Sequence, residues 1–585
     1  MAQGRSEKGE KAARYQALLE QGVNTGETKR EEETEAGGGR GQQRSQGKVR
    51  LAASKAKGRH VKANCALPAG ENIFRETAAA FVLLKHEMDE RCLFCLSELS
   101  DSDNNNHKDN GQTTTTTTTT TTKKIKCPDC IKQTWYCSTD CASADAPRHQ
   151  IECRVVRDLP GITAAAGADY ALFRLLLAIL VREYQNRDDS FVSGSAQPFP
   201  PPTHPDFVFE LLSHRKTADP KWLASVQACA EDFANHLPAE LALPISEIVA
   251  LACRINSNSH GIIDPTGNTN QSVGCGMFPA VAMLNHSCDP NCSFVSSTHG
   301  RMIVRTLRPI DAGEELCVSY VDLCTPRDER RGKLLETKHF WCTCSRCSPA
   351  NITISTVDAQ LDAVLCAACK SPSAFHSPTL EYKCTICDAQ ISEQEHQAIT
   401  NLAESAHNDA YDLFKARHPD SAILAYEQFV TKYKPVLHPR HHLFINAHAT
   451  MASCAVRLSD FVSAVGYGKY VLDGMADYVP ANWPELADFW FRQAEMLEIV
   501  GGAVRERVVE TRVVVENILS SASSTTTTTT NANDFDPGNR DAVSKAVLDL
   551  ALEAYEKCHR MRVVAYGNND SKCLETQLQI SRLKN

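Results

Sequence analysis

The cysteines constrain this chain more than any other feature of its 585 residues. There are 25 of them, and fifteen fall in closely spaced sets. The first residues, MAQGRSEKGEKAARYQ, contain no apolar signal core, so we expect a compartment in which thiols stay reduced. In that setting, CxxC spacing predicts zinc sites rather than disulfide bonds.

The first set of metal-ligating residues lies between residues 92 and 153 and provides eight ligands. Eight ligands fill two tetrahedral zinc sites with none left over. A run of ten threonines at 113–122 separates the first CxxC pair from the second. We expect this run to loop out from the metal module, because low-complexity threonine has nothing to bury. The eight ligands are Cys92, Cys95, Cys127, Cys130, Cys137, Cys141, His149 and Cys153.

Two further sets follow. One supplies three thiols and lacks a fourth ligand, which Cys288 would provide: Cys342, Cys344 and Cys347. The other has two CxxC pairs with zinc-ribbon-like spacing and predicts an additional zinc site: Cys366, Cys369, Cys384 and Cys387. The ten remaining cysteines are scattered, and we expect them to be buried free thiols.

The chemistry of the chain centres on residues 274–320. An apolar run, Phe278–Leu284, should be buried and is followed by NHSCDPN at Asn285–Asn291. Asn, Asp and Pro break regular structure there and leave an amide, an imidazole and a thiol at the edge of a core. A tight polar loop with a satisfied Asn and His is the simple alternative. The later GEEL (Gly313–Leu316) and the Ser319–Tyr320 pair favour a functional site instead.

The pairing of NHSCDPN with GEEL-x-x-SY resembles the core of SET-domain protein lysine methyltransferases. The longer string GCGMFPAVAMLNHSCDPNCSF is similar to the SMYD (SET and MYND) family. The resemblance covers residues 55–585 apart from the Thr-rich insertions. It implies an α+β multidomain fold: a SET-type β fold split by a MYND zinc finger, a post-SET zinc site and a C-terminal TPR-like α-helical domain. It also implies that the finger's ligands interleave. Cys92, Cys95, Cys137 and Cys141 would hold one zinc, and Cys127, Cys130, His149 and Cys153 the other.

The resemblance further implies S-adenosylmethionine (SAM) as cofactor and assigns roles to single residues. Tyr320 is expected to be catalytic, with its phenol where the lysine channel meets the transferred methyl group. The expected cofactor-binding residues are Lys57, Gly58 and Arg59 in a turn near the carboxylate, Asn258 in an expected strand, Asn285, the backbone of His286, Tyr320, and the ring of Phe340 against the adenine. Three positions depart from the family pattern: His60 replaces a glycine, His260 a phenylalanine, and Lys338 a second channel tyrosine.

These motifs divide the chain into seven expected regions. They are a disordered tail at 1–50, a first SET part at 51–91, the MYND finger at 92–153, a mostly helical insertion at 154–260, the SET core at 261–325, the post-SET and CxxC region at 326–390, and a helical domain at 391–585 with a disordered loop at 520–540. The longest apolar run, Ala171–Val181, is short for a membrane span and contains Arg174, so it predicts a buried helix.

The sequence therefore predicts a SAM-dependent protein-lysine N-methyltransferase that acts on histones, other proteins or both. The alternative is a weakly active or inactive SET/MYND scaffold that binds partner proteins through its finger and helices. Lys338, His60 and His260 favour the scaffold, whereas Asn285, Tyr320 and Phe340 favour the enzyme.

The remaining expectations concern binding partners and location. A net charge of −9 disfavours a nucleic-acid partner and suits Lys-rich substrates. We expect three zinc ions and a fourth at the last CxxC pairs, proline-rich peptides at the finger, no membrane and a monomer. Cytoplasm and nucleus both remain open as locations.

Overall fold

The computed structural model describes residues 47–54, 57–99, 124–130, 133–186, 206–264, 271–348, 357–371, 382–384, 386–520 and 538–585. Most of the tail at 1–50, the threonine run at 113–122 and most of the loop at 520–540 lie outside these residues. The chain forms two compact units. The first contains Met1–Asn285, Phe294–Cys317 and Thr337–His339, and the second contains His286–Ser293, Val318–Glu336 and Phe340–Asn585.

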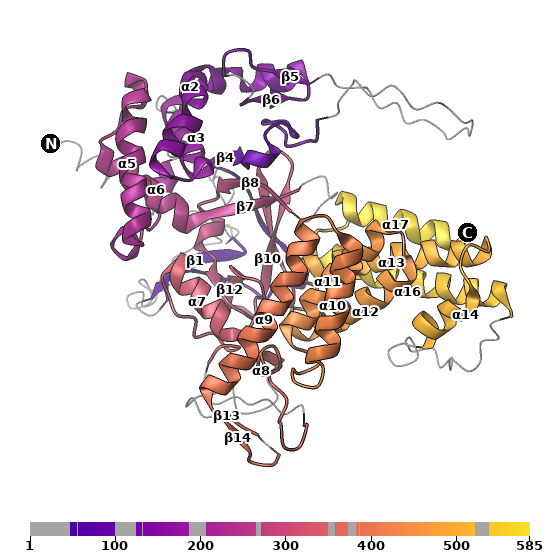
Figure 1. The fold of residues 1–585 in the computed structure, drawn as a ribbon. Coiled ribbons are helices and arrows are strands. Elements are labelled where there is room, and N and C mark those ends of the chain that lie inside the picture. Colours follow the sequence, from indigo (N-terminus) through magenta and orange to yellow (C-terminus); the bar gives the residue numbers. More distant parts are fainter. Residues whose placement is uncertain are drawn as a thin grey trace, which may run out of the picture. The chain divides into compact units, whose positions relative to one another are not determined.

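Short strands form the β part of the fold (Figure 1). Three sheets have the strand orders β1-β2-β12-β9, β10-β11-β3 and β4-β8-β7. The bounds are β1 (Val49–Ser54), β2 (Gly58–Ala63), β3 (Asn72–Thr77), β4 (Ala80–Leu83), β7 (Ser259–Ile263), β8 (Ser272–Met277), β9 (Asn285–His286), β10 (Cys292–Ser297), β11 (Arg301–Thr306) and β12 (Glu315–Val318). Alternate residues of β11 are buried, as a strand with one face on a core requires. The two-stranded sheet β5 (Ile125–Lys126) and β6 (Trp135–Tyr136) belongs to the metal module.

Two glycines of β8 allow β4 to approach closely. A Cβ atom at Gly274 would lie 2.5 Å from the carbonyl oxygen of Val82. A Cβ atom at Gly276 would lie 3.1 Å from the Cβ of Phe81. The GCGM string therefore contributes to packing, because side chains at these positions would force the two strands apart.

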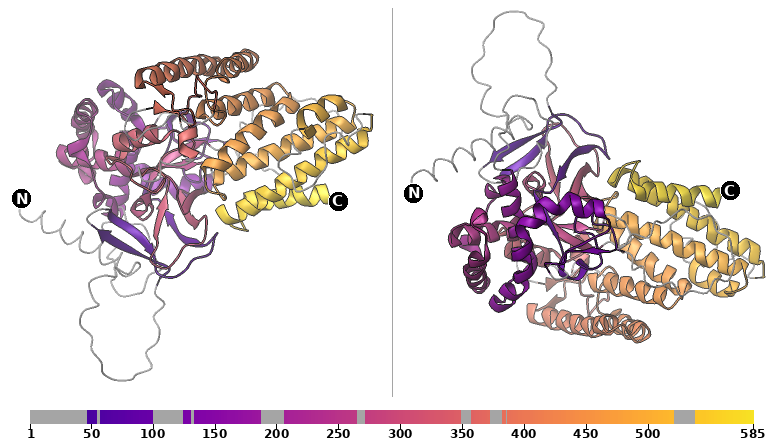
Figure 2. Two further views of the ribbon diagram at one scale, coloured as in Figure 1. Left: turned by 90° about the horizontal axis from the view of Figure 1, so that it is seen from below. Right: turned by 90° about the horizontal axis from the view of Figure 1, so that it is seen from above.

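Four long helices of the first unit pack side by side, as Figures 1 and 2 show. They are α2 (Thr139–Ala166), α3 (Tyr170–Gln185), α5 (Pro220–His236) and α6 (Ile245–Asn258), with the short α4 (Asp206–Phe209) before α5. The ten residues Leu172–Val181 of α3 are all buried, which confirms the predicted buried helix. None of the helices in the described ranges is long and apolar enough to cross a membrane.

The second unit is mainly helical. The capping box of Ser392 and Glu395 fixes the start of α9, and a proline occupies the first turn of α10 and α13. Its elements are α7 (Arg327–Lys338, of which the last two residues belong to the first unit), α8 (Val357–Gln360), β13 (Tyr382–Lys383), β14 (Gln390–Ile391), α9 (Glu393–Lys415), α10 (Pro419–Tyr433), α11 (His442–Arg457), α12 (Phe461–Tyr478), α13 (Pro484–Arg505), α14 (Thr511–Val514), α16 (Arg540–Ala565) and α17 (Ser571–Lys584). Successive helices pack against each other around shared apolar cores, as expected for the C-terminal helical domain.

The structure differs from the sequence predictions at four places. Strand β1 includes Val49 and Arg50, which the sequence predicts as part of the tail. The expected boundary at 153/154 falls inside α2, which continues without a break. Asn258 ends helix α6 instead of lying in a strand. Cys65 is exposed rather than buried, and Cys275 and Cys317 are only partly buried.

Candidate functional site

The side chain of Asn285 is held in the first unit by two acceptors. Its amide group donates to Glu315 Oε1 at 3.0 Å and to the Lys57 carbonyl oxygen at 3.2 Å. The Lys57 ammonium pairs with the other carboxylate oxygen of Glu315, and this hydrogen bond raises the pKa of Lys57. The structure thus brings together two expected cofactor residues, Lys57 and Asn285, around one carboxylate.

Of the three residues expected in a turn, Lys57 precedes β2, and Gly58 and Arg59 are the first two residues of that strand. Gly58 has φ +63°, a conformation that glycine adopts without strain. His60, which stands where the family pattern has a glycine, donates from Nδ1 to the Gly58 carbonyl oxygen at 3.0 Å. His60 is also buried, so it supports the turn rather than opening it. Arg59 reaches the Glu210 carbonyl oxygen at 3.4 Å.

Asn258 lies at the end of α6 because its amide satisfies backbone carbonyls there. Its Nδ2 donates to Arg254 O at 2.8 Å and to Leu212 O at 2.9 Å. A cofactor contact through Asn258 would therefore use Oδ1.

Lys338 donates to the Ser257 carbonyl oxygen at 2.8 Å, so its amine lies at the carboxyl end of α6, where a cation is favourable. Burial nevertheless lowers the pKa of Lys338.

His260 replaces a phenylalanine within an aromatic group. Its ring lies edge-on to Phe278 and Phe294, with centroids 6.1 and 5.5 Å away. Burial and the nearby Lys338 cation lower the pKa of His260 to about 3. The imidazole is therefore neutral at physiological pH and packs as an aromatic ring would.

The remaining site residues lie in the second unit around the imidazole of His286. The Tyr320 backbone N–H donates to His286 Nδ1 at 3.0 Å, and the Ser287 N–H donates to Val318 O at 3.0 Å. The His286 ring centroid lies 5.4 Å from that of Tyr320 and 6.2 Å from that of Phe340. Burial lowers the pKa of His286 to about 4. Three of the expected site residues therefore form one aromatic group.

Sixteen side chains converge in four clusters, and each cluster has the members that the sequence predicts. Within a cluster the ligand atoms all lie within 4.8 Å of one another. Neighbouring sulfur atoms are 3.5 to 3.7 Å apart, as in the pairs Cys288–Cys347 and Cys369–Cys384. A disulfide has sulfurs about 2.05 Å apart. A tetrahedron with Zn–S bonds of about 2.3 Å has edges of about 3.8 Å, so these clusters fit zinc.

Sequence reasoning assigned no role to three charged residues that support these centres. Glu315 was visible in GEEL, but only the structure shows that its carboxylate holds both Lys57 and Asn285. Arg330 lies in the charged string RDERRGK, which reads as a solvated helix surface, yet it is fully buried. Glu152 is also fully buried and lies 3.5 Å from His149 Nδ1, where it can orient this zinc ligand.

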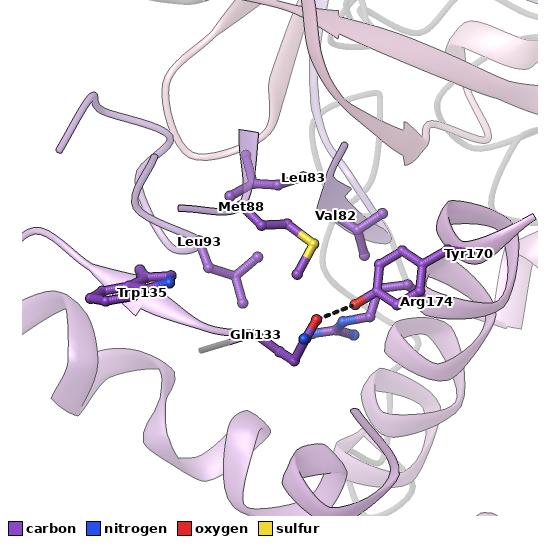
Figure 3. Close-up of a pocket in the computed structure, with 8 residues that line it drawn as sticks. All are labelled: Val82, Leu83, Met88, Leu93, Gln133, Trp135, Tyr170 and Arg174. Carbon is purple, nitrogen blue, oxygen red and sulfur yellow. Dashed lines mark hydrogen bonds between the residues drawn. The ribbon is translucent and has the colours of Figure 1, made fainter. Parts of the chain in front are cut away.

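A small pocket lies between the metal module and helix α3 (Figure 3). Apolar side chains of β4 and the module form its walls, and Tyr170 donates to Gln133 at 3.4 Å on its polar side. It contains none of the expected cofactor or catalytic residues. Its lining residues are Val82, Leu83, Met88, Leu93, Gln133, Trp135, Tyr170 and Arg174.

Comparison with known proteins agrees with this geometry. Residues 58–321 match the family model of the SET domain. N-lysine methyltransferase SMYD2-A of Xenopus laevis is 22% identical over 444 residues, which cover 75% of this chain and 87% of that protein. N-lysine methyltransferase SMYD2 of Homo sapiens is 22% identical, with coverage of 75% and 86%. Histone-lysine N-methyltransferase SMYD3 of Homo sapiens is 25% identical over 311 residues, with coverage of 51% and 61%.

The short strands, the NHSCDPN loop beside Tyr320 and the matched segment define a SET-domain protein. The cysteine clusters, the helical second unit and the relatives that match most of its length narrow the resemblance further. Within the SET-domain proteins, this chain is similar to the SMYD proteins over about three quarters of its length.

Proposed function

We propose that this protein transfers a methyl group from SAM to a lysine side chain of a protein substrate. The observation that carries the proposal is the arrangement of Tyr320, His286 and Phe340, in which the NHSCDPN loop is bonded to the backbone of Tyr320. The relatives named as lysine methyltransferases support the same reaction class. SAM supplies a methyl group on a positively charged sulfur, and the protein's own residues position the reactants.

Residues of each unit have separate tasks in this proposal. In the first unit, Asn285 and Lys57 hold the amino-acid end of the cofactor, with Gly58, Arg59 and Asn258 beside them. In the second unit, the His286 backbone and the Phe340 ring receive the adenine. The Nδ2 group of Asn285 is already used by Glu315 and the Lys57 carbonyl, so its Oδ1 would accept from the cofactor's ammonium group. The cations of Lys57 and Arg59 suit the carboxylate, and aromatic faces suit a purine.

Tyr320 is assigned to the acceptor lysine. A free lysine has a pKa of about 10.4, so its amine must lose a proton before it attacks. A dry, aromatic surrounding favours the neutral amine, and the phenol aligns its nitrogen with the methyl group. With SAM bound, the neutral nitrogen would form the new N–C bond as the S–C bond breaks, and the electron pair of the S–C bond would remain on the sulfur as a neutral thioether.

The test is methyl transfer from labelled SAM to a panel of histones and cytosolic proteins. Wild-type protein should label a substrate. Tyr320→Phe should lower turnover by at least about tenfold while SAM binding is retained, because aligned geometry contributes mainly to the chemical step. Tyr411→Phe, an exposed tyrosine on α9, is the matched control and should behave as wild type. Equal labelling by wild type and Tyr320→Phe would remove Tyr320 from the mechanism.

A scaffold without catalysis is the second candidate, and the position of Lys338 favours it. Lys338 stands at the sequence position where the family pattern has a channel tyrosine. Its amine binds the Ser257 carbonyl oxygen at the carboxyl end of α6. Isothermal titration separates the two candidates. Folded, zinc-replete protein that takes up no SAM would be assigned to partner binding through the finger and the helices. Saturable SAM binding, together with methylation of a substrate by the wild-type protein, would exclude a scaffold without catalysis.

A further inference from the structure

The sulfur atom of Cys288 receives two nitrogen donors from outside its metal cluster. His286 Nε2 lies 3.2 Å from this sulfur, and Arg330 Nε lies 3.3 Å from it. Arg330 has no exposed side-chain surface, and its Nη2 also lies 3.8 Å from Cys347 Sγ. Both donors therefore point at ligand atoms of one cluster.

The tautomer of His286 follows from its other nitrogen. The Tyr320 backbone N–H donates to Nδ1, so Nδ1 carries no proton. An imidazole always keeps at least one proton, which must then be on Nε2. The Nε2–H group faces Cys288 Sγ. One side chain thus links the Tyr320 backbone to a metal-ligating sulfur.

The charge of the cluster explains why such donors are needed. Four thiolates around Zn²⁺ carry a formal charge of about −2, and a buried anion needs hydrogen-bond donors. Arg330 meets this need and is itself held by Asp358, at 2.8 and 3.1 Å. Arg346 binds the same carboxylate and donates to the Cys288 and Tyr478 carbonyl oxygens. A protonated thiol is a weaker acceptor than a zinc-bound thiolate, so the strength of the His286 bond depends on the metal.

We propose that His286 is a positioning residue: its imidazole ties the backbone of Tyr320 to the Cys288 thiolate, so that zinc occupancy of this cluster sets the position of Tyr320. The catalytic consequence of this bridge rests on the proposed methyl transfer. The bridge itself is a hydrogen-bonded link and is measurable without catalysis.

Three substitutions in the full-length, zinc-loaded protein separate the two ends of the bridge. His286→Phe keeps the ring and removes both nitrogens. His286→Gln places an amide NH near Nε2 and keeps the donor to sulfur. His286→Asn places a carbonyl near Nδ1 and keeps the acceptor for Tyr320. The matched control is His236→Gln, an exposed histidine on α5.

Each end has its own readout. For the sulfur end, alkylation of Cys288 is followed by mass spectrometry in the presence of a zinc chelator, with Cys92 as internal reference. Outer-shell partners of metal ligands contribute roughly 10- to 100-fold in metal affinity. Alkylation of Cys288 should therefore be about 10 to 100 times faster in His286→Phe and His286→Asn than in the wild type. In His286→Gln its rate should equal that of the wild type. For the backbone end, amide hydrogen exchange at Tyr320 should accelerate in Phe and Gln and stay slow in Asn.

Turnover supplies the functional arm. In His286→Phe, single-turnover methyl transfer should fall by about tenfold or more, and SAM affinity should change little because the backbone of residue 286 remains. Equal alkylation of Cys288 and equal exchange at Tyr320 in the wild type and the Phe variant would overturn the bridge. If the Phe variant does not fold, the Gln and Asn variants decide by the same two readouts. Wild-type protein that transfers no methyl group would refute the proposed function, and the alkylation and exchange data would still decide the bridge.

Discussion

Single buried histidines show how strongly this chain relies on neutral imidazoles. His441 is fully buried at the start of α11, where its Nδ1 accepts the Leu443 N–H at 3.2 Å and caps the helix. Burial and the neighbouring His442, His396, His438 and His407 push the pKa of His441 well below its ordinary value. Burial also lowers the pKa values of His438 and His442 to about 4. Protonation of any of these histidines therefore costs more free energy in the folded protein than in the unfolded chain.

We predict that the stability of the second unit falls with acidification below about pH 6.5. The unfolded histidines bind protons near pH 6.5 and the folded ones only at lower pH, so the unfolded state takes up more protons in between. Stability is therefore fully present above pH 6.5 and is lost as the pH falls toward 4. Each such histidine contributes a slope of about 1.4 kcal/mol per pH unit in this window.

His441→Asn tests this, because asparagine keeps a capping acceptor for Leu443 and does not titrate. Between pH 6.5 and pH 5.5, the free energy of unfolding should fall by about 1 kcal/mol less in the variant than in the wild type. Urea unfolding at both pH values measures this difference. The exposed His418→Asn is the control and should keep the wild-type pH dependence. An unchanged slope in His441→Asn would show that this residue does not contribute.

At the scale of elements, a buried ion network joins helices α2 and α3. Glu152 of α2 is bound by Arg148 at 2.7 Å and by Arg174 of α3 at 2.6 and 2.9 Å. Burial alone would raise the pKa of Glu152, but the two arginines hold it well below its usual range. Asp145 and the Tyr136 hydroxyl, 2.7 Å apart, extend the network into the metal module.

We predict that Arg174→Met destabilises the protein by about 3 kcal/mol or more, because it leaves part of the Glu152 charge unpaired in a buried site. Thermal or urea unfolding with metal content held constant measures the loss. Lys221→Met, an exposed position on helix α5, is the control and should stay within about 0.5 kcal/mol of wild type. A similar small change for Arg174→Met would mean that the network adds no net stability.

How far the sequence predicts these elements depends on how local the constraint is. The ligand sets are readable because zinc imposes fixed spacing on Cys and His, and the buried helix α3 is readable because Ala171–Val181 is apolar apart from Arg174. The strand predicted at Asn258 is wrong because nothing local reveals that its amide satisfies carbonyls at the end of α6. Arg330 was missed for a related reason, since its partners Asp358 and Cys288 are distant in the sequence.

At the scale of the whole molecule, the four cysteine-rich clusters found in the described residues differ in exposure. The cluster formed by Cys366, Cys369, Cys384 and Cys387 has two exposed members, whereas the one containing Cys288 has three buried members and one partly buried. Chelators reach exposed sulfurs first. The clusters should therefore release their metal in a set order.

We predict four zinc ions per chain and first loss from the cluster that contains Cys369 and Cys387. Zinc measured by atomic emission should fall from four to three at low chelator concentration, while methyl transfer persists. Alkylation followed by mass spectrometry should label Cys369 and Cys387 before Cys288. Labelling of Cys288 before Cys369 and Cys387 would contradict the predicted order of zinc loss. A fully loaded protein with three zinc ions would contradict the predicted number.

Helix α2 runs for 28 residues from the metal module into the insertion. Its first fifteen residues include the expected zinc ligands Cys141, His149 and Cys153, and the residues after them bury Val156, Leu159 and Ile162. The module therefore has no hinge at its carboxyl end and cannot be replaced as a separate unit. Grafting the finger of a relative would need to splice within a continuous helix and preserve its rotational phase. Natural variation between relatives should accordingly be freer in the sequence before Lys124 than in the sequence after Ser138.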